Sequence, residues 1–149
     1  MTGFRSGPVH SSTEADVIAI HCSDPRYQPH FQQFLNSTLG PGHYAAVVVP
    51  GGPQLLALAD YLPKFAWSGW RWVKFLVDLS RARRVVLIQH DDCRWYHDTR
   101  FLHMADDIAA RQLEDMRRVR GALTERFGLK DVRLYVATLE GEEAVFQEV

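Results

Sequence analysis

The chain has 149 residues, of which 46% are hydrophobic and 23% are charged, and its formal net charge is −1 at pH 7. These values are ordinary for one soluble globular domain, and so balanced a charge predicts no nucleic-acid partner and no acidic membrane surface. No apolar run approaches the ~18 residues that a membrane-spanning helix needs, so we expect no membrane contact.

The first 15 residues are predicted to be a flexible lead-in, followed by a single domain over residues 16–149. Their sequence, MTGFRSGPVHSSTEA, lacks the apolar core of a secretion signal. The chain has two cysteines, which are too few for a disulfide framework. We therefore expect a cytoplasmic protein whose cysteines stay reduced.

Strands and helices are predicted to alternate along this domain. The expected strands are four runs rich in β-branched residues: DVIAIH (16–21), YAAVVV (44–49), RVVLIQ (84–89) and VRLYVAT (132–138). The first two are predicted to be buried. The expected helices are PHFQQFLNSTLG (29–40), residues 54–80 with breaks near Pro63 and Ser68-Gly69, and about 104–127 with Gly128 at its end.

These elements predict an α/β fold with a mostly parallel β-sheet of about four strands, flanked by helices on both faces. The C-terminal segment EAVFQEV (143–149) follows a turn in LEGE and is predicted to add an antiparallel edge strand. The tryptophans are interpreted as core or interface residues: Trp67, Trp70, Trp72 and Trp95.

Polar motifs follow three of the predicted strands. HCSDPR (21–26) follows the first, PGGP (50–53) the second and HDDC (90–93) the third. Because the carboxyl ends of parallel strands meet at one edge of a sheet, where ligands bind, the first and third motifs are expected to converge. PGGP lacks the lysine and the serine or threonine of a P-loop, so it gives little indication of phosphate binding.

The two converging motifs have the residue types of a metal site. Thiolates from Cys22 and Cys93 together with the imidazole of His90 favour Zn²⁺ in tetrahedral geometry, with water or a carboxylate in the fourth position. Asp24 is the candidate for that position or for orienting its water, and Arg26 for pairing with Asp24. The alternative is two buried thiols, a hydrogen-bonded histidine and a structural ion pair.

Other polar residues in and near HDDC indicate a function less strongly. Asp91 and Asp92 are typical of a turn or a helix start, although one of them can orient a ligand. His97 and His103 are candidates for lining the pocket and moving protons, against exposed or locally hydrogen-bonded histidines as the default.

With these motifs the chain resembles the β-class carbonic anhydrases, whose zinc site combines Cys-x-Asp-x-Arg at one strand end with His-x-x-Cys at another. The matching stretches are CSDPR (22–26) and HDDC (90–93), and the order of predicted elements agrees from Asp16 to Val149. The chain departs from the family pattern at Pro25, at Arg94 and in VPGGP (49–53), and we expect the family's N-terminal arm, which carries a pocket glutamine, to be missing.

The resemblance implies a lyase that interconverts CO₂ and bicarbonate by zinc-bound hydroxide, with one zinc ion per chain. Cys22, His90 and Cys93 would be the zinc ligands. Asp24 would accept a hydrogen bond from the hydroxide, or coordinate zinc in a closed, inactive form, and Arg26 would pull Asp24 off the metal.

The resemblance also implies a homodimer or a higher homo-oligomer as the assembly. Two alternatives for the function remain open. The first is a zinc hydrolase that acts on a CO₂ analogue, carbonyl sulfide or carbon disulfide. The second is a non-catalytic zinc-binding module in which Asp24 closes the metal site.

Overall fold

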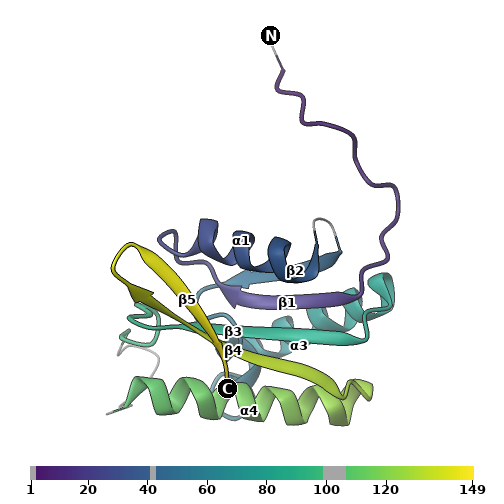
Figure 1. The fold of residues 1–149 in the computed structure, drawn as a ribbon. Helices are drawn as coiled ribbons and strands as arrows, with labels where there is room; N and C mark the ends of the chain where they lie inside the picture. Colours follow the sequence, from purple (N-terminus) through teal and green to yellow (C-terminus); the bar gives the residue numbers. More distant parts are fainter. Residues whose placement is uncertain (1–2, 41–42, 99–106) are drawn as a thin grey trace.

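The central feature of the molecule is a five-stranded β-sheet. The computed structural model describes residues 3–40, 43–98 and 107–149. The strands lie in the order β2-β1-β3-β4-β5, and the first four of these are parallel, whereas β5 pairs with β4 in antiparallel fashion (Figure 1). Their bounds are β1 Val17–Cys22, β2 Tyr44–Val49, β3 Arg84–His90, β4 Asp131–Glu140 and β5 Glu143–Glu148. The predicted α/β fold with its antiparallel C-terminal edge strand is confirmed.

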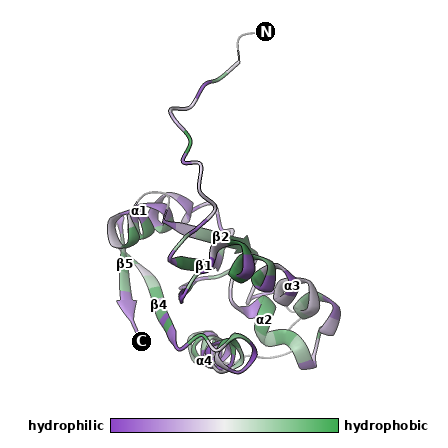
Figure 2. Cartoon of the chain, turned by 90° about the vertical axis from the view of Figure 1, so that its right-hand side faces the viewer, coloured by the Kyte–Doolittle hydropathy of each residue, from purple (hydrophilic) through white to green (hydrophobic). Residues whose placement is uncertain are grey.

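Helices cover both faces of the sheet, as predicted (Figure 2). Helix α1 packs on one face, and α2, α3 and α4 pack on the other. The helices are α1 Gln28–Leu39, α2 Gln54–Ala57, the 3-10 helix η1 Leu58–Asp60, α3 Pro63–Ser80 and α4 Ile108–Phe127. Helix α4 begins after Asp107, whose carboxylate accepts a hydrogen bond from the Ala110 N–H. It ends at Gly128, which has a positive φ that favours glycine.

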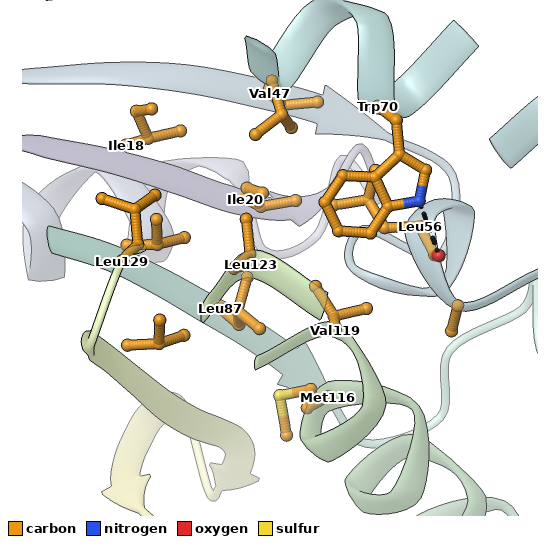
Figure 3. Close-up of a cluster of buried hydrophobic side chains, with 14 of the residues drawn as sticks. Ile18, Ile20, Val47, Leu56, Trp70, Leu87, Met116, Val119, Leu123 and Leu129 are labelled. Atoms are coloured by element: carbon orange, nitrogen blue, oxygen red, sulfur yellow. Dashed lines mark hydrogen bonds between the residues drawn. The ribbon is translucent and has the colours of Figure 1, made fainter. Parts of the chain in front are cut away.

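The core is divided into two layers by the sheet, because successive side chains of a strand point to opposite faces. Ile18 and Ile20 of β1 pack with Leu87, Met116 and other residues of the α2–α4 face, as Figure 3 shows. Within this layer the Trp70 indole N–H donates to the Leu56 carbonyl at 3.2 Å. On the opposite face, β1 and β3 pack against aromatic residues of α1. The predicted buried character of β1 is therefore correct, since all six of its residues are buried.

Two predictions about the other elements are wrong. No helix break occurs at Ser68-Gly69, because α3 runs unbroken from Pro63 to Ser80. Gly69 instead allows α2 to approach α3, since a Cβ there would lie 2.8 Å from the Leu55 side chain. Strand β2 is not buried throughout: it is the edge of the sheet, and only Val47 of its six residues is buried.

Residues 3–15 contain no helix or strand and lead away from the rest of the molecule (Figure 1). Among the described residues, none of the helices is both long and apolar enough to cross a membrane.

The sheet opens at the carboxyl ends of its two central strands. Strand β1 pairs with β3 only as far as Ile20↔Leu87, although the β1–β2 ladder continues to Cys22↔Val49 and the β3–β4 ladder continues to His90↔Ala137. The connection after β1 leads outward to β2 on one side of the sheet, whereas the connection after β3 leads outward to β4 on the other side. Ligands of open α/β sheets bind at the point between two such strands. The fold therefore places the ends of β1 and β3 on two sides of a binding position.

Candidate metal centre

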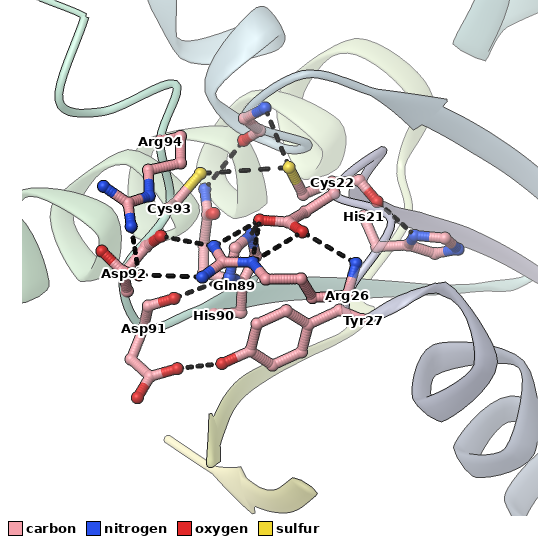
Figure 4. Close-up of polar contacts among 12 residues, drawn as sticks. His21, Cys22, Arg26, Tyr27, Gln89, His90, Asp91, Asp92, Cys93 and Arg94 are labelled. Atoms are coloured by element: carbon pink, nitrogen blue, oxygen red, sulfur yellow. Dashed lines mark hydrogen bonds and ion pairs between the residues drawn. The ribbon is translucent and has the colours of Figure 1, made fainter.

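Three predicted ligands meet at this opening. Cys22 is the last residue of β1, His90 is the last residue of β3, and Cys93 follows in the turn after β3. One donor atom from each lies within 4.8 Å of the others, and all three side chains are buried (Figure 4). The two sulfur atoms are 3.9 Å apart. Two thiolates bound to a tetrahedral zinc ion at ~2.3 Å each would lie ~3.8 Å apart, so the cluster can hold such an ion.

His90 presents a free lone pair to this cluster. Its Nδ1 lies 2.7 Å from the Asp91 carbonyl oxygen, which can only accept a hydrogen bond. Nδ1 must therefore carry the proton, and Nε2 is the unprotonated nitrogen. Nε2 is buried and has no hydrogen-bond partner among the described residues. A buried nitrogen without a partner is costly unless a ligand such as a metal ion binds it.

Cys22 is favoured as a thiolate before any ion is considered. The Cys93 thiol lowers the pKa of Cys22 by hydrogen bonding to it, and the Gly51 N–H acts in the same direction against the effect of burial. The same pairing with Cys22 raises the pKa of Cys93.

Asp24 and Arg26 form an ion pair at the rim of the cluster. The Arg26 guanidinium donates from Nη2 to Asp24 Oδ2 at 2.7 Å and from Nε to Oδ1 at 3.1 Å. Arg26 holds the pKa of Asp24 below its usual range, so the carboxyl is ionised. Asp24 Oδ2 also lies 4.0 Å from His90 Nε2. The Asp24 carboxylate therefore lies next to the position that an ion would take, and both of its oxygens accept hydrogen bonds from Arg26.

Asp92 is a second partner of Arg26 that sequence reasoning did not identify. Arg26 Nη1 donates to Asp92 Oδ2 at 2.9 Å, and Nη2 donates to the Asp92 carbonyl at 2.9 Å. Asp91 and Asp92 lie in a turn, one of the two placements expected from the sequence, and Asp92 has a φ of 46°. The nearby Tyr27 hydroxyl donates to Asp91. Both acids thus tie the turn after β3 to the segment after β1.

The structure describes one of the two histidines that were candidates for proton transfer. The half-exposed side chain of His97 lies 3.8 Å from Asp92, where it neighbours the Arg26 ion pair rather than the ligand cluster. His103 lies outside the described residues.

The loop after β2 contributes backbone groups that the sequence analysis did not foresee. The Gly51 N–H donates to Cys22 Sγ at 3.3 Å. Gly52 lies against β1, since a Cβ there would be 2.8 Å from the Cys22 nitrogen. Both residues have a positive φ, which favours glycine. Two adjacent glycines one residue after the end of a strand were the signal for such a close backbone approach.

An open pocket of about 630 Å³ leads to the cluster. Three of the residues at which the chain departs from the carbonic anhydrase pattern, Pro25, Pro50 and Arg94, lie on its wall. The lining residues are Cys22, Ser23, Asp24, Pro25, Arg26, Pro50, Arg94, Trp95 and Asp98. Bulky and charged side chains after Cys93 thus shape the entrance without occupying the ligand positions.

Known proteins resemble this chain in structure and not in sequence. No protein-family model matches the chain, and no curated protein matches it by sequence. The β-carbonic anhydrase CafA of the fungal pathogen Aspergillus fumigatus aligns with a TM-score of 0.51 and 15% identity over 91% of this chain and 76% of that protein. A carbonic anhydrase from Streptococcus mutans aligns with a TM-score of 0.52 and 13% identity over 96% and 87%. The chain therefore has the fold of the β-carbonic anhydrases, as its motifs predict.

Proposed function

We propose that the chain is a zinc-dependent lyase of the carbonic anhydrase type, which interconverts CO₂ and bicarbonate. The observation that carries this proposal is the cluster of Cys22, His90 and Cys93, whose donor atoms lie within 4.8 Å of one another. It lies beside an ionised carboxylate at the carboxyl ends of β1 and β3. The fold supports the same function, since the two aligned proteins are carbonic anhydrases.

Zinc is the metal that suits these donors best, with one ion per chain. Two thiolates and one neutral imidazole form a soft, three-ligand set that leaves one position open, as in catalytic zinc sites. When bound there, zinc supplies hydroxide by lowering the pKa of a water molecule. His90 is held in the correct tautomer by the Asp91 carbonyl.

Asp24 and Arg26 would act on the reacting groups. Asp24 would accept the hydrogen bond of the attacking oxygen and so orient its lone pair toward CO₂. Arg26 keeps Asp24 ionised and holds both of its carboxylate oxygens. This pairing favours the catalytic function over the alternative of a non-catalytic module, in which Asp24 would turn away from Arg26 and close the metal.

A CO₂ analogue is the second candidate substrate. Pro25, Pro50 and Trp95 give the pocket wall an apolar part, which suits neutral linear molecules such as carbonyl sulfide and carbon disulfide as well as CO₂. The same ligands and the same Asp24–Arg26 pair would serve that hydrolysis.

Metal analysis and stopped-flow kinetics test these proposals together. We expect one zinc ion per chain in the purified protein, loss of that ion in Cys22→Ser, and retention of zinc with greatly reduced CO₂ hydration in Asp24→Asn. Zinc far below one ion per chain, unchanged by Cys22→Ser, would refute the metal site. A zinc-loaded protein that is inactive on CO₂ even at high pH would exclude the anhydrase, and turnover of carbonyl sulfide alone would select the second substrate.

We also propose a homo-oligomer, in which a second copy of the chain covers an apolar surface on β2 and α3. Strand β2 is an edge strand, and a groove of about 590 Å³ lies between it and α3. Apolar side chains on this surface are exposed: Val48, Trp72, Phe75 and Leu79. An apolar surface of this kind beside an open strand edge favours pairing with another chain, and a two-fold axis would let both copies use the same strand.

Light scattering of the purified protein tests the assembly. We expect a dimer or larger species for the wild type and a monomer for Trp72→Glu. Leu139→Glu is the matched control, because Leu139 is equally exposed but lies on β4. A monomeric wild type, or a Trp72→Glu variant with unchanged mass, would refute the proposed role of this surface in assembly.

The cytoplasmic location of the protein stays a prediction.

A further inference from the structure

The separation of the metal ligands is not fixed by the backbone ladder of the sheet. Cys22 belongs to the β1–β2 side of the opening, whereas His90 and Cys93 belong to the β3–β4 side. The β1–β3 ladder ends at Ile20↔Leu87, before either ligand strand ends. Side-chain and loop contacts must therefore hold the two sides at the distance that a metal ion needs.

The side-chain amide of Gln89 bridges the opening. Gln89 precedes His90 in β3 and is completely buried. Its Nε2 donates to the Gly51 carbonyl at 3.1 Å and to the Tyr96 hydroxyl at 3.0 Å. The N–H of the same Gly51 donates to Cys22 Sγ at 3.3 Å. One amide thus connects the loop that holds Cys22 to a residue three positions after Cys93.

Tyr96 is in turn anchored to helix α4. Its hydroxyl donates to Asp115 Oδ2 at 2.9 Å, and Arg111 Nε donates to Asp115 Oδ1 at 2.9 Å. Asp115 is completely buried, and Tyr96 is almost so. The Tyr96 backbone N–H donates to the Cys93 carbonyl at 3.1 Å. The donors point in one direction along this chain, from Gln89 to Tyr96 to Asp115, so each hydroxyl and amide proton has an acceptor.

We propose that Gln89, Tyr96 and Asp115 form a positioning network that sets the distance between Cys22 and the His90–Cys93 pair and so raises the affinity for the metal ion. This inference rests on the metal centre proposed above. The three residues are positioning residues, because none of them supplies a donor atom to the ligand cluster. They act on metal binding because a buried polar group that loses its partner is costly, which resists any change in the separation of the two sides.

Removing single polar groups from the network tests the inference. The variants are Tyr96→Phe, which deletes one hydroxyl, and Gln89→Met, which replaces the amide by an apolar side chain of similar length. Tyr135→Phe is the matched control, because the Tyr135 hydroxyl pairs with Glu148 at the surface, away from the ligands. For each full-length protein the zinc affinity is measured by competition with a chromophoric chelator. The thiolate-to-cobalt absorption of the Co²⁺ form is recorded as a second readout.

We expect Tyr96→Phe and Gln89→Met each to weaken zinc binding about tenfold or more, as losses of outer hydrogen bonds to metal sites do, and to shift the Co²⁺ spectrum. The double variant should be little weaker than the worse single one, because the two residues act in one chain of hydrogen bonds. Tyr135→Phe should match the wild type. Should Gln89→Met fail to fold, Asp115→Asn replaces it, with an affinity expected between those of Tyr96→Phe and the wild type.

Two results would overturn the inference, and they are distinguishable. If the wild type binds zinc and the network variants bind it with the same affinity and the same Co²⁺ spectrum, the network has only a structural role and the metal centre stands. If the wild type binds neither ion, the metal centre itself is refuted, and the positioning role is refuted with it.

Discussion

Replacing Gly52 by alanine tests whether the loop after β2 is pressed against the strand that carries Cys22. A Cβ on Gly52 would lie 2.8 Å from both the Cys22 nitrogen and the His21 carbonyl carbon. Ordinary contacts of a Cβ begin at 3.4 Å, so either the loop or the end of β1 must move by about 0.6 Å. These neighbours are backbone atoms, which cannot rotate away as the tip of a long side chain can.

Two costs are expected from this substitution. Gly52 has a φ of 52°, and a left-handed conformation costs a residue with a Cβ about 1–2 kcal/mol. Forcing extra atoms into a filled space adds about 1–3 kcal/mol. The free energy of unfolding should therefore fall by about 2–5 kcal/mol. Zinc binding should also weaken, because the adjacent Gly51 N–H would move relative to Cys22 Sγ.

Urea unfolding of the metal-free protein measures the loss, and two other glycines separate its causes. Gly128 has a φ of 69° but open space around it, so Gly128→Ala should show the conformational cost alone, about 1–2 kcal/mol. Gly121 lies within α4 in open space, and Gly121→Ala should stabilise the protein by about 1 kcal/mol. If Gly52→Ala is no more destabilising than Gly128→Ala, the loop is not pressed against β1 and the reasoning fails.

Three further substitutions test the core, a helix end and an ion pair. Met116→Ala should lower the free energy of unfolding by about 2–5 kcal/mol in urea, because Met116 is completely buried against the sheet; a loss below that of a surface substitution would contradict the packing. Asp107→Ala should cost about 1 kcal/mol and reduce helicity by circular dichroism, since Asp107 accepts from the Ala110 N–H at the start of α4. Arg84 lowers the pKa of Asp131 below 3.8, so the ionised carboxylate stabilises the fold above the unfolded pKa and loses this effect as the pH falls through the folded pKa. Asp131→Asn should therefore cost under about 1 kcal/mol at pH 7 and nothing in acid; a cost that persists in acid would exclude the ion pair as its cause.

The convergence of the candidate metal ligands could be predicted because it depends on topology alone. Apolar, β-branched runs before Cys22 and before His90 identify two parallel strands, and parallel strands of one sheet end at the same edge. Residue type and spacing then indicate the metal. This inference needs no knowledge of side-chain positions, because the ends of the two strands bring the candidate ligands close to one another.

Features that depend on strand order or side-chain direction could not be predicted. YAAVVV has the composition of a central strand, yet β2 lies at the edge. The composition of a strand reports its fit to a sheet and not its place in the order. Gly69 reads as a helix breaker until the contact with Leu55 is known. Likewise, a glutamine at the end of an apolar strand is unusual, but its two acceptors on Gly51 and Tyr96 follow only from the loop conformations.

The departures from the carbonic anhydrase pattern are structurally linked to one another. A Cβ added to Gly51 would collide with the indole ring of Trp95, so the large side chain after Cys93 occupies space that only a glycine in the VPGGP loop leaves open. Trp95 in turn lines the pocket together with Pro25 and Arg94. The altered loop and the altered turn are therefore one change in the shape of the pocket. Because this change leaves the donor atoms of the three candidate ligands within 4.8 Å of one another, we expect it to affect which molecule reaches the proposed metal rather than whether a metal can bind.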